Sequence, residues 1–149
     1  MIEVEIDDEA WSEILFDVQS RVEAAATLAL EEAGVVTISL SDDDTVADLN
    51  QRFRDKAGPT NVLSFPAPET ARPFLGDVIL AYGVCAREAG EQGKSLSDHM
   101  QHLVVHGVLH LLGHDHMDED EAEIMESRER MILAQLGLKD PYAFRDEPG

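Results

Sequence analysis

The sequence predicts an α+β domain in which one mixed four-stranded β-sheet is packed by about five α-helices. Four short stretches have strand character, and they begin near residues 2, 35, 61 and 75. The segments between and after them repeat apolar residues at helical spacing. A chain of 149 residues is long enough to bury one hydrophobic core. We therefore expect a single domain over residues 1–149, with a loosely ordered tail from about residue 140.

The chain begins with a strand and a long helix. Residues 2–6 alternate apolar and charged side chains, which is typical of a strand with one buried face. Residues 9–33 then carry apolar side chains at helical spacing, and Gly34 follows as a natural helix end. Trp11 stands at the start of this apolar stripe, so we expect it in the core.

Three further strands and two helices follow. Residues 35–40 are rich in β-branched side chains and predict the second strand. The three aspartates at 42–44 are interpreted as caps of the next helix, because acids favour its positive N-terminus. Residues 61–65 and 75–81 have strand character, and residues 83–91 predict a short helix.

Two capping pairs predict the last two helices. Ser95 with Asp98, and Asp118 with Glu121, each place an acid three residues after a capping side chain. The helix after Ser95 is mostly apolar and carries a stripe of histidines. The acidic residues from Asp118 to Glu129 are interpreted as a solvated face of the last helix.

Charge and composition restrict the function. The net charge of −20 argues against a general nucleic-acid binder, because phosphate contacts come from Lys and Arg. Residues 52–94, however, carry six basic and five acidic residues, so this segment is +1 and the remainder is −21. A face that an RNA strand can approach is therefore possible. With no signal core and no apolar run of about 20 residues, we expect a cytoplasmic protein without a membrane span. The lone Cys85 is interpreted as core.

The run from His106 to His116 concentrates the groups able to bind a metal. On a helix, His106 and His110 lie one turn apart on the same face, so both imidazoles can reach one ion. Gly113 is expected to end the helix in a left-handed conformation that brings His116 back as a third ligand. Three neutral imidazoles suit zinc, and the fourth position stays open for water, as in catalytic sites.

Zinc metallopeptidases share these offsets but carry a glutamate, their general base, directly after the first histidine. This chain has Gly107 there, so a different hydrolysis is implied. A glycine inside a helix also predicts that something, backbone or substrate, approaches closely. On the same histidine stripe, His102 competes as a ligand and His99 is expected to reach solvent.

The run resembles the signature of the YbeY family, bacterial zinc-dependent endoribonucleases and ribosomal RNA maturation factors. The similarity comprises its three expected ligand histidines, both glycines and its aspartate, and it extends over nearly the full chain. Arg54 within residues 50–56, residues 59–66 and residues 75–78 resemble other motifs of the family. His114 stands where a tyrosine is commoner, which puts a fourth imidazole near the expected metal.

The resemblance implies a single YbeY-like hydrolase domain with one zinc ion per chain, bound by His106, His110 and His116. It implies a single-strand-specific endoribonuclease that matures the 3′ end of 16S ribosomal RNA and contributes to ribosome quality control. Its partners are then single-stranded RNA and the small ribosomal subunit. Arg54 is expected to hold the phosphate, and Asp115 is a second catalytic candidate.

Several alternatives stay open at the level of sequence. The general base could be Asp115, His114 or His102, or the 2′-hydroxyl of the RNA could itself be the nucleophile. Arg54 could be only a cation favoured by the helix dipole. The chain could hydrolyse another substrate class, or it could be a ribosome assembly factor with a mainly structural zinc. The sequence does not fix the oligomeric state.

Overall fold

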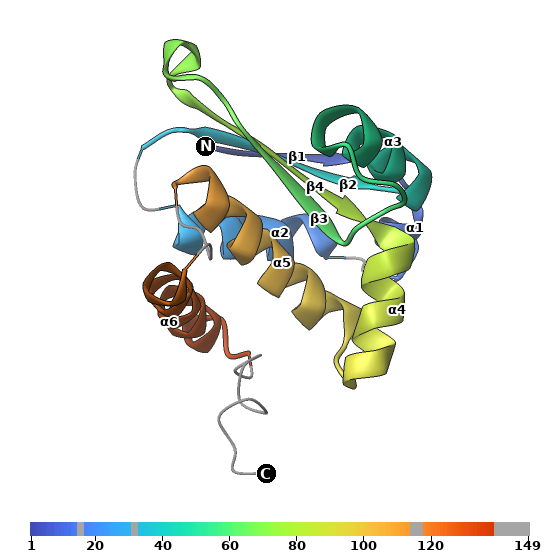
Figure 1. The fold of residues 1–149 in the computed structure, drawn as a ribbon. Helices are drawn as coiled ribbons and strands as arrows, with labels where there is room; N and C mark the ends of the chain where they lie inside the picture. The colour runs from blue at the N-terminus through green and yellow to red at the C-terminus, as the bar shows by residue number, and fades with distance from the viewer. Residues whose placement is uncertain (15–16, 31–32, 114–117, 139–149) are drawn as a thin grey trace.

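The structure, a computed structural model, describes residues 1–14, 17–30, 33–113 and 118–138. The expected tail from about residue 140 lies outside these ranges. Figure 1 shows the course of the chain. The elements follow in the order β1 (Ile2–Ile6), α1 (Ala10–Ile14), α2 (Val18–Ala29), β2 (Val35–Ser41), α3 (Asp43–Arg54), β3 (Val62–Pro66), a 3₁₀ turn (Glu69–Ala71), β4 (Phe74–Ala81), α4 (Tyr82–Gln92), α5 (Leu96–Leu111) and α6 (Glu119–Gln135).

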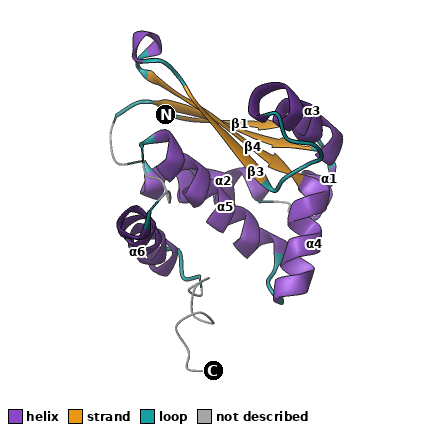
Figure 2. Cartoon of the chain, in the orientation of Figure 1, coloured by secondary structure: helices purple, strands orange, loops and turns teal. Residues whose placement is uncertain are grey.

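The four strands form one sheet in the order β1-β2-β4-β3 (Figure 2). Strand β2 pairs in parallel with both β1 and β4, whereas β3 pairs antiparallel to β4. The long helical connections between the parallel strands make this pairing possible. The predicted α+β domain with a mixed four-stranded sheet is therefore confirmed, and each predicted strand is found within two residues of its expected ends.

The prediction of one long helix over residues 9–33 is wrong. Two helices, α1 and α2, occupy this segment, and the backbone of Asp17 before α2 is not helical (φ −107°, ψ 27°). Helix α2 ends at Ala29 because Leu30 is already extended (φ −77°, ψ 104°). Gly34 does not cap this helix. A Cβ there would lie 2.6 Å from Leu75 Cδ1, so this glycine allows the close approach of the chain to β4.

The hydrophobic core lies between the sheet and the helices on one of its faces. Helices α2 and α5 pack against this face, α6 packs against both of them, and α3 lies on the opposite face over β3 and β4 (Figure 1). Trp11 is fully buried as expected, and its indole Nε1 donates to Ser41 O at 3.0 Å. Cys85 is also core, and burial raises the pKa of its thiol to about 12. No described helix is long and apolar enough to cross a membrane.

Capping side chains start the helices at the expected residues. Asp42 accepts from Thr45 N, Ser95 from Asp98 N and Asp118 from Glu121 N, at 2.7, 3.1 and 2.8 Å. Asp43 has a further role, because its carboxylate accepts from the N–H of Val84 at 3.1 Å, in the first turn of α4. The aspartate run 42–44 therefore begins two helices and needs no metal to explain it.

Gly107 allows α5 to pack closely against the sheet. A Cβ built on this glycine would lie 2.5 Å from Val78 Cγ1 and 3.2 Å from Ser64 Oγ. Ser64 Oγ donates to Gly107 O at 3.0 Å, which ties β3 to the same turn of the helix. The predicted close approach at Gly107 is found. The expectation that backbone or substrate makes it is wrong, because side chains of the sheet do.

Replacing Gly107 by alanine should destabilise the fold. Val78 is fully buried and its χ1 is stiff, so the added methyl group forces an overpacking cost of about 1–3 kcal/mol. The alanine regains at most about 1 kcal/mol of helix propensity. Gly90→Ala in α4 is the matched control, because a Cβ there meets nothing within 4 Å. Thermal unfolding should show a lower Tm for Gly107→Ala and a higher one for Gly90→Ala. Two shifts of the same sign would contradict this packing.

The first turn of α5 holds a buried histidine. His99 was expected to reach solvent, which is wrong: its side chain is only 3% exposed, and its Nε2 lies 2.9 Å from Glu88 Oε1 on α4. Burial lowers the pKa of His99 below its usual value, and the bond to Glu88 only partly offsets this. Glu88 also accepts from Asn61 Nδ2 at 3.0 Å. His99 therefore links α4, α5 and the start of β3. It is not a candidate metal ligand.

Candidate metal centre

Helix α5 brings two histidines together one turn apart. The Nε2 atoms of His106 and His110 are 3.0 Å apart, and the two ring centroids are separated by 4.6 Å. The side chain of His106 is 23% exposed, so the pair lies partly open at the surface of the helix. The predicted convergence of these two imidazoles is what the helix produces.

A buried carboxylate on α6 sets the orientation of His106. Glu129 is completely buried, and its Oε1 accepts from His106 Nδ1 at 2.6 Å. A carboxylate can only accept, so the tautomer of His106 that satisfies Glu129 carries its proton on Nδ1 and turns the lone pair of Nε2 toward His110. Nε2 of His110 lies within hydrogen-bonding distance of that lone pair, at 3.0 Å. A histidine that donates from one nitrogen to a carboxylate is oriented and made more basic for binding a metal at the other.

His102 shares the same carboxylate. Its Nε2 lies 3.3 Å from Glu129 Oε2, and its side chain is 15% exposed. This contact engages Nε2 of His102 with Glu129. The structure therefore favours His102 as a partner of the buried carboxylate over its alternative role as a ligand.

Glu129 is the residue that the sequence interpretation missed. The acids from Asp118 to Glu129 were expected to form a solvated face, which is wrong for Glu129. The signal was its spacing, since Glu129 lies four residues after Met125 and three before Ile132, both of them core residues. An acid at a core position of an apolar stripe needs buried partners, although the spacing alone does not say which residues supply them.

The donor set fits a zinc site as far as it is described. Two nitrogens that each lie about 2.0–2.1 Å from one tetrahedral zinc ion are roughly 3.3 Å apart, close to the 3.0 Å observed. A cation bound by both nitrogens would take the place of the contact between them. The third expected ligand, His116, lies outside the described residues, as do His114 and Asp115. Within residues 1–14, 17–30, 33–113 and 118–138, no three His, Cys, Asp or Glu side chains gather as a metal cluster.

The end of α5 has the geometry expected of a turn. The helix stops at Leu111, and Gly113 takes φ +98°, which is a conformation that favours glycine. The N–H of Gly113 donates to His110 O at 3.1 Å. The chain therefore turns directly after the histidine pair, as the position of the glycine predicted.

Arg54 lies where β3 meets α5. It is the last residue of α3, and its Nη2 donates to Ser64 O at 2.6 Å. Ser64 in turn bonds to Gly107, the residue after His106. No carboxylate pairs with Arg54 in the described part of the chain, and its side chain reaches β3 and not its own helix end. These contacts place a cation beside the helix that carries the histidine pair.

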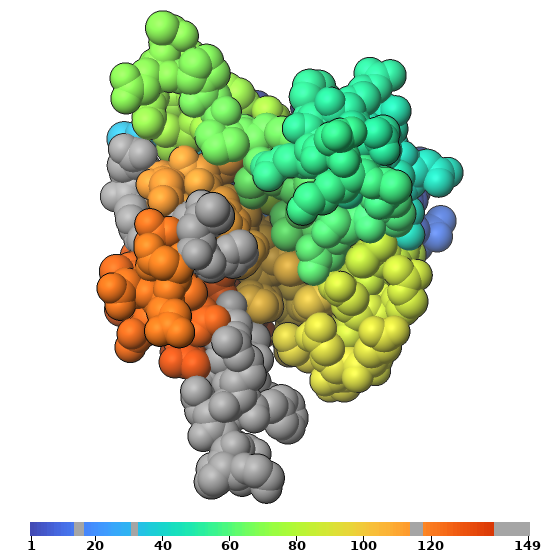
Figure 3. Space-filling model, viewed as in Figure 1, coloured from blue at the N-terminus to red at the C-terminus, as the bar shows by residue number. Residues whose placement is uncertain are grey.

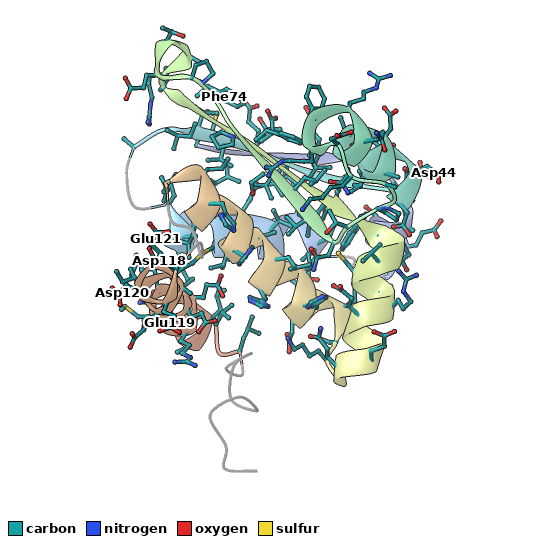
Figure 4. All side chains as sticks on the ribbon, in the orientation of Figure 1. Asp44, Phe74, Asp118, Glu119, Asp120 and Glu121 are labelled. Carbon is teal, nitrogen blue, oxygen red and sulfur yellow. The ribbon has the colours of Figure 1, made fainter. Side chains whose placement is uncertain are left out.

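Four consecutive acids lie on another element. Asp118, Glu119, Asp120 and Glu121 gather at the start of α6 and point away from the sheet (Figure 4). Helix α3 (teal) and the second half of α5 (light orange) both reach the face shown in Figure 3. In this view α6 (darker orange) lies on the other side from α3, so the element that carries Arg54 is apart from the one that carries these acids. This agrees with the uneven charge along the sequence.

Comparison with known proteins identifies the family. The sequence model described as "Endoribonuclease YbeY" matches residues 2–137. The chain belongs to this family. The YbeY resemblance found in the run from His106 to His116 is thereby confirmed for nearly the whole chain.

Relatives of the YbeY family cover the chain almost completely. It is 48% identical to endoribonuclease YbeY of Maricaulis maris over 153 residues, covering 99% of this chain and 94% of that protein. It is 50% identical to endoribonuclease YbeY of Paramagnetospirillum magneticum over 155 residues, covering 95% and 94%. The fold is similar to the solution structure of a Thermotoga maritima protein, with a TM-score of 0.57, 23% identity and coverage of 95% and 98%.

In this member of the YbeY family, Glu129→Gln should weaken zinc binding. The amide keeps the shape of the side chain but removes the charge that holds His106, and loss of such a partner lowers metal affinity about 10- to 100-fold. The dissociation constant for zinc, measured by competition with a chromogenic chelator, provides the test. Glu123→Gln, on the exposed face of the same helix, is the control and should leave the constant unchanged. Equal constants for the two variants would show that Glu129 only packs.

Proposed function

We propose that this protein is a zinc-dependent, single-strand-specific endoribonuclease with one zinc ion per chain, held by His106, His110 and His116. One observation carries the proposal. The Nε2 atoms of His106 and His110 lie 3.0 Å apart, while Glu129 holds the His106 ring through Nδ1. Membership of the endoribonuclease YbeY family supports RNA as the substrate.

The chemistry divides between the metal and the residues around it. When bound, zinc supplies Lewis-acid chemistry, lowering the pKa of a coordinated water to about 7 and polarising a phosphoryl oxygen. Glu129 keeps the His106 ring in the orientation that presents Nε2. Arg54 binds a phosphate oxygen of the strand through its guanidinium, which is anchored at Ser64. Asp115, directly before His116, is one candidate for the general base, beside His114 and His102.

Membership of the family supports a specific biological substrate. We infer that the protein matures the 3′ end of 16S ribosomal RNA, acts in ribosome quality control and works in the cytoplasm on the small subunit. Peptide hydrolysis is disfavoured by Gly107, because the peptidase glutamate would have to occupy a position that Val78 fills. The full chain from residue 1 to 149 is proposed to act as one domain.

The function is tested with the purified zinc protein on three substrates: single-stranded RNA, duplex RNA of the same sequence, and casein-like peptides. We expect cleavage of the single strand alone, lost on chelation and restored by zinc. His110→Ala should lose both stoichiometric zinc and cleavage while most of the fold remains, as circular dichroism reports. Unfolding of His110→Ala would instead indicate a structural zinc. Proteolysis without RNA cleavage would contradict the proposal and indicate a metallopeptidase activity.

Reversal of the charge at Arg54 tests the phosphate contact. Arg54→Glu removes a charge-assisted hydrogen bond of about 1.5–3 kcal/mol, so kcat/KM for single-stranded RNA should fall at least about 10-fold, with zinc content unchanged. Arg52→Glu makes the same change in net charge on the same helix, where Arg52 pairs with Asp48 at 3.2 Å. A smaller loss for Arg52→Glu is expected. Losses of equal size would mean that Arg54 acts only through net charge.

A further inference from the structure

An exposed aromatic ring stands beside the cation that is proposed to bind phosphate. Phe53 on α3 is 66% exposed, although phenylalanine usually buries most of its surface. The other large hydrophobic side chains that the structure describes as exposed are the aliphatic Met1, Ile124 and Met131. One exposed apolar residue needs no explanation by itself. The neighbours of Phe53 are what single it out.

Phe53, Arg54 and Phe65 form one cluster, here called the Phe53–Arg54–Phe65 cluster. The rings of Phe53 and Phe65 meet edge to face, with centroids 5.6 Å apart and planes at 68°. The Arg54 guanidinium carbon lies 5.7 Å from the Phe65 centroid, within the range of a cation–π contact. Phe65 therefore supports both an exposed ring and a guanidinium, and the bond from Arg54 to Ser64 O fixes the cation in place.

This arrangement matches the repeating chemistry of a single nucleic-acid strand. Such a strand presents a phosphate to a cation and an unpaired base to an aromatic ring, and proteins that bind it combine both contacts. The local charge also agrees, because residues 52–56 hold three basic residues and one acid in a chain of net charge −20. A duplex cannot use such a ring, since its bases are already stacked on one another.

We propose that Phe53 is a stacking platform for an unpaired base of the RNA strand whose phosphate Arg54 binds, and that it contributes to the preference for single strands. The inference rests on the proposed endoribonuclease function, which it deepens by naming a base subsite. Phe53 is a positioning residue here, since it holds the strand without touching the reacting phosphate. Its exposure means that replacing it should leave the Tm nearly unchanged.

Fluorescence provides a direct test that needs no cleavage. In Phe53→Trp, the new indole is quenched when a base stacks on it, whereas the fully buried Trp11 gives a constant background. The probe is the zinc protein with a short single-stranded RNA carrying 2′-O-methyl riboses. Ile124→Trp, at a position with a similar 61% exposure on α6, is the matched control and should show little quenching. Equal quenching at the two positions, or none at Phe53→Trp, would refute stacking.

Cleavage kinetics test the consequence for specificity. Phe53→Leu should raise KM for single-stranded RNA about tenfold with kcat nearly unchanged, and Phe53→Tyr should restore it, because tyrosine keeps the ring. An RNA with an abasic residue at the stacked position should penalise the unmodified protein and not Phe53→Leu. If the unmodified protein cleaves single-stranded RNA and Phe53→Leu has the same KM, the base subsite is wrong while the proposed function stands. If the unmodified protein cleaves no RNA, the proposed function fails, and quenching of Phe53→Trp still decides the stacking separately.

Discussion

A buried carboxylate needs hydrogen-bond partners, and those of Glu129 are His102 and His106 on the neighbouring helix α5. Taking an ionised glutamate out of water is expensive unless hydrogen bonds replace its hydration, and both oxygens of Glu129 are bonded to histidines of α5. This pairing holds α6 against α5 and orients His106 at the same time. The position of α6 and the geometry of the candidate centre therefore depend on one interaction.

Local patterns predicted the elements that local physics decides. The strands followed from alternation and β-branching, the helix starts from Asp42, Ser95 and Asp118, and the histidine pair from a spacing of four. Contacts between elements were not predictable in this way. Glu129 is buried against α5, where its partner His106 lies 23 residues earlier in the chain, and the burial of His99 depends on Glu88 of α4. Residues 9–33 form two helices although they contain no glycine or proline that would have predicted it.

Gly107 explains why this chain has the histidine spacing of the zinc metallopeptidases without their glutamate. Residues four apart share a face of α5, while the residue directly after His106 faces the sheet, where Val78 and Ser64 occupy the space. A side chain as large as glutamate cannot stand there without moving the helix away from the strands. The same turn reaches Arg54 through Ser64, so the close packing that excludes a general base at this position also places a cation nearby.

The bond between Arg54 and Ser64 also affects how the sheet ends. Strand β3 is an edge strand, and an open edge offers backbone groups on which another chain can pair and aggregate. A carbonyl that already accepts from a guanidinium is a poorer acceptor for an incoming strand, and Pro66, which ends β3, has no N–H to donate. The opposite edge, β1, alternates Glu3 and Glu5 with its apolar residues. Pairing with another chain is therefore disfavoured at both edge strands, at β3 by a cation and a proline and at β1 by like charges.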